Sequence, residues 1–293
     1  METVDGSPST LQWYEESRLK YQQVEVGFWS VPKEYVKFKI SPTLNITHIG
    51  TATAILELNG FNMLTDPFFS PAGSTWPITD KVALTVEDDL ALRLEQLPVI
   101  DAVLLSHEDH PDNLDELGRR LLNDRRVFTT LWGKIDTVIA GQKPQIIGTS
   151  TQHLPGGEYT GFIVTGEGFG TGRDGLPNAI WFLDDTVYID ELKKMAEEYH
   201  ICAAVLNLGN AYAPANLEGP NGPLLQITMD GKSAARLIKT DVLVPMHYES
   251  WGHFTQFGEE LAEGFESESV MDKVCWPKPG EAVSVSPVYN HYA

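Results

Sequence analysis

The chain has 293 residues, which is enough for one large domain or two ordinary ones with a substantial hydrophobic core. Its formal net charge of -20 at pH 7 argues against a nucleic-acid partner, because affinity for DNA or RNA depends largely on Lys and Arg contacts to phosphate. The sequence holds no stretch of about 18 consecutive apolar residues and begins with an acidic, polar segment, so we expect no membrane span and a cytoplasmic location. The expected partner is a small-molecule substrate, and the sequence leaves the oligomeric state open.

The predicted elements follow an N-terminal arm that comprises residues 1–35. From residue 36 onward β-strand patterns dominate, and the Asn59-Gly60 step predicts a two-residue hairpin turn between two strands. The predicted strands span residues 36–40, 44–49, 52–58, 61–65, 102–105, 127–130, 145–147, 159–165, 180–183, 202–206 and 242–246. The predicted helices span residues 114–122, 132–140, 190–199 and 231–239. This alternation indicates one α/β domain, residues 36–293, in which two sheets pack together with helices outside.

Two further segments carry local signals. Residues 209–228 are rich in Asn, Gly, Pro and Ala, and a segment of this length and composition is typical of a substrate-binding loop. The two cysteines, Cys202 and Cys275, lie far apart and in no Cys-x-x-Cys pattern, so no disulfide framework is expected. Cys202 lies in an apolar run and is expected to be a small buried side chain, while His200 is expected to be structural.

The most informative segment spans residues 104–115 and reads Leu-Leu-Ser-His-Glu-Asp-His-Pro-Asp-Asn-Leu-Asp. The apolar run that leads into it predicts a buried strand, and two imidazoles and several carboxylates follow directly. Carboxylates that crowd together repel one another and resist burial unless a cation or hydrogen bonds hold them. The segment therefore predicts a metal site at the C-terminal end of this strand.

Metal-capable side chains also follow several other predicted strands. The residues in such positions are His48, Asp66, Asp184, Asp185 and His247, together with His153 in the loop after strand 145–147. Active sites of layered α/β folds are assembled from loops at strand ends, so we expect these side chains to lie close together.

The order of these motifs resembles that of the metallo-β-lactamase superfamily, in particular its branch of broad-specificity hydrolases. The family pattern comprises a His-x-Gly-x-Ala-Thr strand pair, a Thr-Asp-Pro, a Ser-His-x-His-x-Asp-His signature, a lone His, a Gly-Asp-Thr and a Pro-x-His-Tyr. The counterparts here are His48 to Thr53, Thr65-Asp66-Pro67, Ser106 to Asn113, His153, Asp184-Asp185-Thr186 and Pro245-Met246-His247-Tyr248. The resemblance implies a four-layer αββα sandwich with metals held at one edge between two sheets.

The resemblance also implies a set of metal ligands. The expected ligands are His107, His110 and His153 for one metal, Asp112 and His247 for a second, and Asp185 as a bridge. One or two Zn2+ ions are expected, with Mn2+ or Fe2+ as alternatives. Such metals lower the pKa of bound water and polarise a carbonyl or phosphoryl oxygen.

The chain departs from the family signature in the segment that carries it. The segment reads His107-Glu108-Asp109-His110-Pro111-Asp112-Asn113, with one inserted residue and with Asn113 in place of the last His. Asp109 or His110 can therefore take the place of the second His, and we prefer His110 because imidazole is the better zinc ligand. Asn113 is a weak neutral ligand, which predicts a poorer second metal site. Asp112 or Asn113 could instead cap the following helix.

Other residues have supporting roles in this hypothesis. Asp66 and Asn113 would lie behind the ligands and orient them. His48 or Tyr248 would help to stabilise an oxyanion. The expected lining of the substrate pocket is Tyr212, Trp251 and His253.

The function that the resemblance implies is metal-dependent hydrolysis of a small organic molecule, with a lactam or lactone as the preferred substrate. A metal-bound hydroxide would attack the carbonyl, and Asp112 or Asp185 would pass a proton to the leaving group. A phosphodiesterase of small or lipid-derived diesters is one alternative. A metal-poor binding protein or a non-hydrolytic enzyme on the same fold is another.

Overall fold

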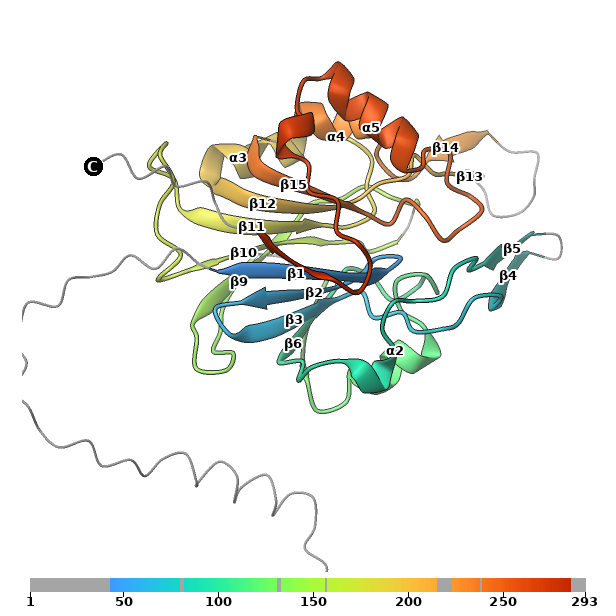
Figure 1. The fold of residues 1–293 in the computed structure, drawn as a ribbon, viewed down its shortest axis with the longest axis horizontal. Helices are drawn as coiled ribbons and strands as arrows, with labels where there is room; N and C mark the ends of the chain where they lie inside the picture. The colour runs from blue at the N-terminus through green and yellow to red at the C-terminus, as the bar shows by residue number, and fades with distance from the viewer. Residues whose placement is uncertain are drawn as a thin grey trace, which may run out of the picture. The chain divides into compact units, whose positions relative to one another are not determined.

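Two six-stranded sheets stack on each other in the computed structural model, and helices lie on their outer faces (Figure 1). The structure describes residues 43–79, 82–130, 133–155, 157–214, 223–237 and 239–285. This arrangement is the predicted αββα sandwich. The predicted N-terminal arm and the strand at 36–40 lie outside the described residues.

The first sheet has the strand order β16-β1-β2-β3-β6-β7. Its strands are β16 (Ala282–Val285), β1 (Leu44–Gly50), β2 (Thr53–Leu58), β3 (Phe61–Thr65), β6 (Ala102–Leu105) and β7 (Arg126–Thr129). The turn between β2 and β3 has positive φ angles at Asn59 (50°) and Gly60 (84°), which confirms the predicted two-residue hairpin. Because β3, β6 and β7 run parallel, their C-terminal ends reach the same edge of the sheet.

The second sheet has the order β15-β12-β11-β10-β9-β8. Its strands are β15 (Thr240–Met246), β12 (His200–Asn207), β11 (Asn178–Leu183), β10 (Gly161–Gly166), β9 (Pro144–Thr149) and β8 (Lys134–Asp136). The strands β11, β12 and β15 are parallel, so each sheet contributes a group of parallel strand ends.

The main core lies between the two sheets. Leu56 and Met63 of the first sheet meet Phe162, Phe182 and Val205 of the second in one cluster of buried side chains. The Phe162 and Phe182 rings stack with their centroids 6.4 Å apart. This packing holds the two sheets together and brings their edges into a fixed relation.

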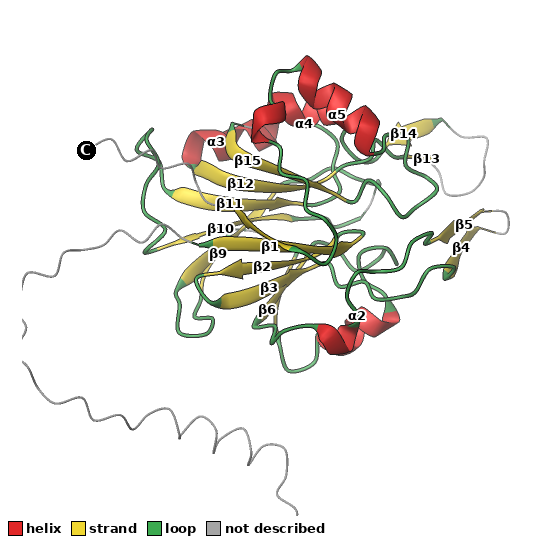
Figure 2. Ribbon diagram, in the orientation of Figure 1, coloured by secondary structure: helices red, strands yellow, loops and turns green. Residues whose placement is uncertain are grey.

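Separate apolar clusters attach the helices to the outer faces (Figure 2). The helices are α2 (Glu116–Leu121) on the first sheet, and α3 (Met195–Glu198), α4 (Gly231–Leu237) and α5 (Gly258–Ser267) on the second. Short 3-10 turns occur at Leu94–Gln96, Asp190–Lys194 and Met271–Lys273. None of the helices in the described ranges is long and apolar enough to cross a membrane.

Two small hairpins lie at one end of the sandwich (Figure 1). One pairs β4 (Thr75–Thr79) with β5 (Val82–Thr85), and the other pairs β13 (Tyr212–Pro214) with β14 (Leu224–Gln226). The second hairpin is built from the predicted substrate loop, of which residues 215–222 lie outside the described ranges. Its role in substrate binding stays a prediction.

One predicted helix is wrong, and several elements were not predicted. Where a helix was predicted at 132–140, the described residues 133–140 contain the strand β8 and an isolated bridge from Ile139 to Gln142. Ile135, Thr137, Val138 and Ile139 are β-branched, which favours extended chain. The helix α5, the strand β16 and the hairpin of β4 and β5 were not predicted.

The N-terminus of α2 ties this helix to the loop after β3. Asp115 caps α2 by accepting a hydrogen bond from the Gly118 amide at 2.6 Å, so neither Asp112 nor Asn113 is the cap. The same carboxylate accepts a hydrogen bond from the Phe69 amide at 3.0 Å. Gly118 lies so close to this loop that a Cβ atom there would be 1.7 Å from the Pro67 carbonyl oxygen.

We expect Gly118→Ala to destabilise the protein by about 2 kcal/mol or more, because the added methyl group overlaps the Pro67 carbonyl. Helix propensity alone predicts the opposite, a gain of about 1 kcal/mol. Chemical denaturation measures the free energy of unfolding of both proteins. Arg120→Ala, at an exposed position of the same helix, is the matched control. A Gly118→Ala variant as stable as wild type would contradict this contact.

Candidate metal centre

The ends of four parallel strands bring the predicted site residues to one edge between the sheets. Asp66 follows β3, His107 follows β6, Asp184 and Asp185 follow β11, and His247 follows β15. All five side chains are buried. Asp66 and His247 also have φ angles of 28° and 50°, a backbone conformation that non-glycine residues rarely adopt. Such strain is concentrated at functional sites.

Three histidines face one another at this edge. The Nε2 atom of His107 lies 3.1 Å from the Nδ1 atom of His110, and ligand atoms of His107, His110 and His153 all lie within 4.8 Å of one another. Two nitrogens bound tetrahedrally at Zn–N distances of about 2.0–2.1 Å would be about 3.4 Å apart. The three imidazoles therefore fit one metal ion.

Hydrogen bonds fix the orientation of two of these rings. His153 donates from Nδ1 to the Ile227 carbonyl oxygen at 2.7 Å, which leaves its Nε2 atom free. The Nδ1 atom of His107 lies 2.8 Å from the Ser106 hydroxyl and 3.3 Å from an oxygen of Asp184. Partners of this kind set the tautomer of a metal-binding histidine and hold its ring in place.

His247 lies between two carboxylates. Its Nε2 atom is 3.5 Å from Asp112 and its Nδ1 atom is 3.7 Å from Asp185. No described residue offers a hydrogen bond to Oδ1 of Asp112 or to Oδ1 of Asp185, although both atoms are buried. A buried carboxylate oxygen without a partner is costly, and a cation would satisfy it. The two carboxylates lie at opposite nitrogens of the His247 ring, so the second metal stays a prediction.

The electrostatics of the cluster favour positive charge at the imidazoles. Burial alone would lower the pKa of His107, but the adjacent Asp184 raises it to about 10. Burial likewise opposes protonation of His247, but Asp185 and Asp112 raise its pKa to about 9. The carboxylates thus attract cationic charge to the positions that a divalent metal would fill.

Asp66 lies behind His107 and holds its segment in place. It accepts hydrogen bonds from the Ser106 amide at 2.7 Å, the Ser106 hydroxyl at 2.8 Å and the Asn113 amide group at 3.2 Å. Burial and the neighbouring Asp184 raise the pKa of Asp66 to about 8. The described contacts therefore place Asn113 as a partner of Asp66, in the supporting position predicted for both.

The structure separates the two alternatives at the second histidine position. His110 points into the histidine group, whereas Asp109 is exposed. The inserted residue is accommodated in the turn after β6, so the spacing His107 to His110 still brings two ring nitrogens together. The geometry therefore favours His110 as the ligand.

Two residues were predicted to stabilise an oxyanion, and their contacts do not favour this role. His48 is half-buried, and its Nε2 atom donates to the Thr51 carbonyl oxygen at 3.1 Å, so this proton is already used. Tyr248 packs its ring against Trp276 beneath the outer helices of the second sheet. These contacts place the Tyr248 side chain in the outer cluster and give no support to a role at the oxyanion.

The three residues that were predicted to line the substrate pocket do not lie together. Trp251 is buried and packs on Phe68 and Trp76, with ring centroids 5.5 and 5.9 Å away. Tyr212 is exposed on the hairpin of β13 and β14. His253 is half-buried, its pKa is lowered by burial, and Asp112 is among the charges that act on it. Only His253 thus lies near the proposed ligands.

Tyr159 is a site residue that sequence reasoning missed. Its ring centroid lies 4.9 Å from that of His107, 5.0 Å from His153 and 6.0 Å from His110. Gly157 makes room for it, because a Cβ atom at Gly157 would lie 2.0 Å from the Tyr159 hydroxyl. The Gly-Gly step before Tyr159 was the available signal, but no motif or periodicity marks the tyrosine itself.

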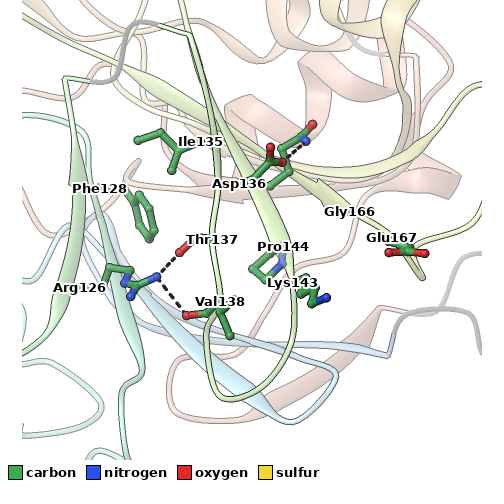
Figure 3. Close-up of a pocket in the computed structure, with 11 residues that line it drawn as sticks. Arg126, Phe128, Ile135, Asp136, Thr137, Val138, Lys143, Pro144, Gly166 and Glu167 are labelled. Carbon is green, nitrogen blue, oxygen red and sulfur yellow. Dashed lines mark hydrogen bonds between the residues drawn. The ribbon is translucent and has the colours of Figure 1, made fainter.

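Two cavities in the described part of the protein have no histidine in their lining. One, of about 720 Å3, opens between β7, β8 and β9, where Arg126 donates to the Val138 carbonyl oxygen at 3.0 Å (Figure 3). A second cavity of about 480 Å3 has Tyr159, Thr160 and Gln152 in its wall. Tyr159 therefore both lines this cavity and contacts the three imidazoles.

Comparisons with known proteins agree with this geometry. No family model matches the chain. A UPF0173 metal-dependent hydrolase from Methanopyrus kandleri is 24% identical over 265 residues, which cover 82% of this chain and 99% of that protein. The solved isothiocyanate hydrolase from Delia radicum gut bacteria is 24% identical, with a TM-score of 0.66 over 83% of this chain and 99% of that one.

A protein with a different chemistry shares the fold. CmlA, a diiron β-hydroxylase from Streptomyces venezuelae, is 12% identical, with a TM-score of 0.52 over 83% of this chain and 54% of that one. Fold and site thus define an αββα protein with a histidine and aspartate cluster at the sheet edge. The chain shares this fold with its structural neighbours, as the resemblance to the metallo-β-lactamase superfamily implied, and the relatives that it matches over almost their whole length are described as hydrolases.

His110→Ala is expected to weaken metal binding at least about 10- to 100-fold, because it removes one of three imidazoles that face a common point. Competition with a chelating dye measures the affinity, and elemental analysis measures the stoichiometry. Asp109→Ala is the matched control from the same turn and should bind metal as wild type does. Loss of metal from Asp109→Ala with retention in His110→Ala would reverse the assignment of the ligand.

Asp184 stands where the family pattern has Gly, and its contact with His107 predicts a measurable effect on the metal. We expect Asp184→Gly to bind metal about 10- to 100-fold more weakly, since His107 loses the carboxylate at its Nδ1 atom. Asp184→Asn, which keeps an acceptor oxygen, should recover part of the loss. Equal affinities for wild type and both variants, with unchanged folding by circular dichroism, would show that Asp184 does not support the ligand.

Proposed function

We propose that the protein is a metal-dependent hydrolase of a small uncharged molecule, with a cyclic amide or ester as the preferred substrate class. The observation that supports this most is the arrangement of the His107, His110 and His153 group beside the His247 group of Asp112 and Asp185. The three histidines would hold one metal, and His247, Asp112 and Asp185 would supply ligands for a second at the same buried edge.

The charge of the site favours an uncharged substrate. Asp66, Asp112, Asp184 and Asp185 are all buried there, and the ion pairs that the structure shows for them are with histidines and not with Lys or Arg. Two divalent cations would neutralise four carboxylates, whereas a single cation would leave the site negative. A phosphodiester anion would find no spare positive charge, so this alternative is less well supported.

The bound metal would supply a water of lowered pKa and a Lewis acid for the carbonyl oxygen. Side chains of the protein would transfer the proton and orient the substrate. Asp112 is held ionised by His247, which keeps the pKa of this buried carboxylate well below its usual range, so Asp112 would readily give up any proton that it receives. A proton received there could be passed to the leaving nitrogen or oxygen. Tyr159 contacts the histidine rings and lines the 480 Å3 cavity, and its hydroxyl would help to orient the substrate carbonyl.

Isothiocyanates are a second candidate substrate class. They are small, uncharged and electrophilic at carbon, so the charge argument applies to them equally. The likeness of the chain to an isothiocyanate hydrolase over 99% of that protein supports this candidate. Water would add to the central carbon, and cleavage of the carbon–nitrogen bond would release an amine and carbonyl sulfide.

The first test is the metal content of the purified protein. Elemental analysis should find at least one metal per chain, since the three histidines bring their ligand atoms together at a largely buried position. A content below about 0.2 per chain that added Zn2+, Mn2+ or Fe2+ does not raise would overturn the proposal. That result would favour the alternative hypothesis, a metal-poor binding protein on the same fold.

The second test is turnover of a panel that contains a lactam, a lactone, an isothiocyanate and a phosphodiester. We expect hydrolysis of an uncharged member, with a loss of at least about 100-fold in kcat/KM for His107→Ala and after chelation. Tyr159→Phe should lower activity by a smaller factor at unchanged metal content. Activity that survives both His107→Ala and chelation would contradict catalysis at this centre, and turnover of the diester alone would replace the proposed substrate class.

A further inference from the structure

A second group of metal-capable side chains lies at the opposite end of the second sheet. His200 and Cys202 begin β12, and Asp241 lies at the start of the neighbouring β15. The metal centre proposed above lies at the C-terminal ends of these strands. At about 3.3 Å per residue, the eight residues of β12 separate the two groups by roughly 25 Å.

The three side chains converge within ligand distance. The Nε2 atom of His200 lies 3.0 Å from Asp241 Oδ2. The ligand atoms of His200, Cys202 and Asp241 all lie within 4.8 Å of one another. Cys202 is buried, while His200 and Asp241 are half-buried, so an ion could reach the group from solvent.

The local backbone is shaped around this group. Relative to β11, the strand β12 has one extra residue, because Ala179 pairs with Ile201 and Ile180 pairs with Ala203. Cys202 is the extra residue. A bulge of this kind redirects a side chain, and bulges are over-represented beside functional sites. The sequence interpretation of Cys202 as a small buried hydrophobic residue therefore omits its polar neighbours.

A carboxylate and a glycine fix the orientation of the His200 ring. Its Nδ1 atom lies 2.9 Å from Asp174, whose other oxygen accepts a hydrogen bond from the Leu176 amide at 3.0 Å. The imidazole ring rests on Gly172, where a Cβ atom would lie 2.2 Å from the ring. A carboxylate at one ring nitrogen and a ligand position at the other is the usual environment of a metal-bound histidine.

We propose that His200, Cys202 and Asp241 form a second metal site for an ion that accepts nitrogen, sulfur and oxygen ligands, of which Zn2+ is the expected one. The three ligands leave one tetrahedral position for water. A thiolate and a carboxylate together balance the charge of a divalent ion.

Metal binding at this site must release a proton from Cys202. Burial and the neighbouring Asp241 raise the pKa of Cys202 to about 12, so the thiol stays protonated in the absence of metal. The ion forms a bond to sulfur, and the thiol proton passes to solvent. The same raised pKa makes Cys202 a poor free nucleophile, which argues against a role in covalent catalysis.

Co2+ separates this site from the first, because a cobalt–thiolate bond gives a charge-transfer absorption that a histidine and aspartate centre cannot give. The full-length wild-type protein, freed of metal and titrated with Co2+, should show this absorption as it fills. Cys202→Ser should lose the absorption and about one equivalent of Co2+. Cys275→Ser is the matched control from the other cysteine of the chain and should retain both.

Two further variants keep the result decisive. His107→Ala should lose metal from the first centre but keep the thiolate absorption, so the outcome does not depend on the proposed hydrolase function. His200→Gln, which keeps both cysteines, should weaken the Co2+ affinity of the thiolate site at least about 10-fold if Cys202→Ser fails to fold. The absence of a thiolate absorption in wild type, or an equal absorption in Cys202→Ser, would contradict the proposed site. Either result would leave His200 as an imidazolium paired with Asp174 and Asp241.

Discussion

Four carboxylates buried at one sheet edge are the constraint on which the rest of this structure depends. Asp66, Asp112, Asp184 and Asp185 expose between 0 and 6% of their surface. Burying an ionised carboxylate costs several kcal/mol unless hydrogen bonds or opposite charge compensate. The Ser106 and Asn113 hydrogen bonds satisfy Asp66, whereas oxygens of the other three lie without hydrogen-bond partners among the described residues. Cationic charge on histidine or metal is the compensation that the geometry provides.

The strand order makes this concentration of charge possible. Parallel pairing of β3 with β6, and of β11 with β12 and β15, brings residues far apart in sequence to one edge. The interior of the sandwich is apolar, and β6 and β11 end on buried leucines that are followed directly by the buried polar residues Ser106 and Asp184. The positive φ angles of Asp66 and His247 show that the backbone turns sharply there to direct side chains into the site. Packing of α2 against the Pro67 loop supports one of these turns.

The sequence predicted the strands and the strand-end residues better than the loops. His107, His153 and His247 could be identified because an apolar run precedes each or a motif surrounds it, and the resemblance gave their order. The inserted residue permits two alignments, so the sequence could favour His110 over Asp109 only on ligand chemistry, whereas the structure shows which side chain faces the other histidines. Tyr159 lies in a loop whose path depends on close approach at Gly157, which no periodicity encodes. The helix expected at 132–140 failed because its pattern of apolar residues occurs equally in a β-branched edge strand.

The two departures from the family signature act in the same direction. Asn113 replaces an imidazole, and Asp184 adds a carboxylate where the family pattern has Gly, so the site loses nitrogen and gains oxygen. The His107 group stays rich in nitrogen, whereas His247 is surrounded by Asp112 and Asp185. Imidazole-rich sites suit Zn2+, while carboxylates suit harder ions such as Mn2+. The two proposed positions of this centre would therefore favour different metals, and the proposed site of His200, Cys202 and Asp241 would add a third, softer ligand set at the other end of β12.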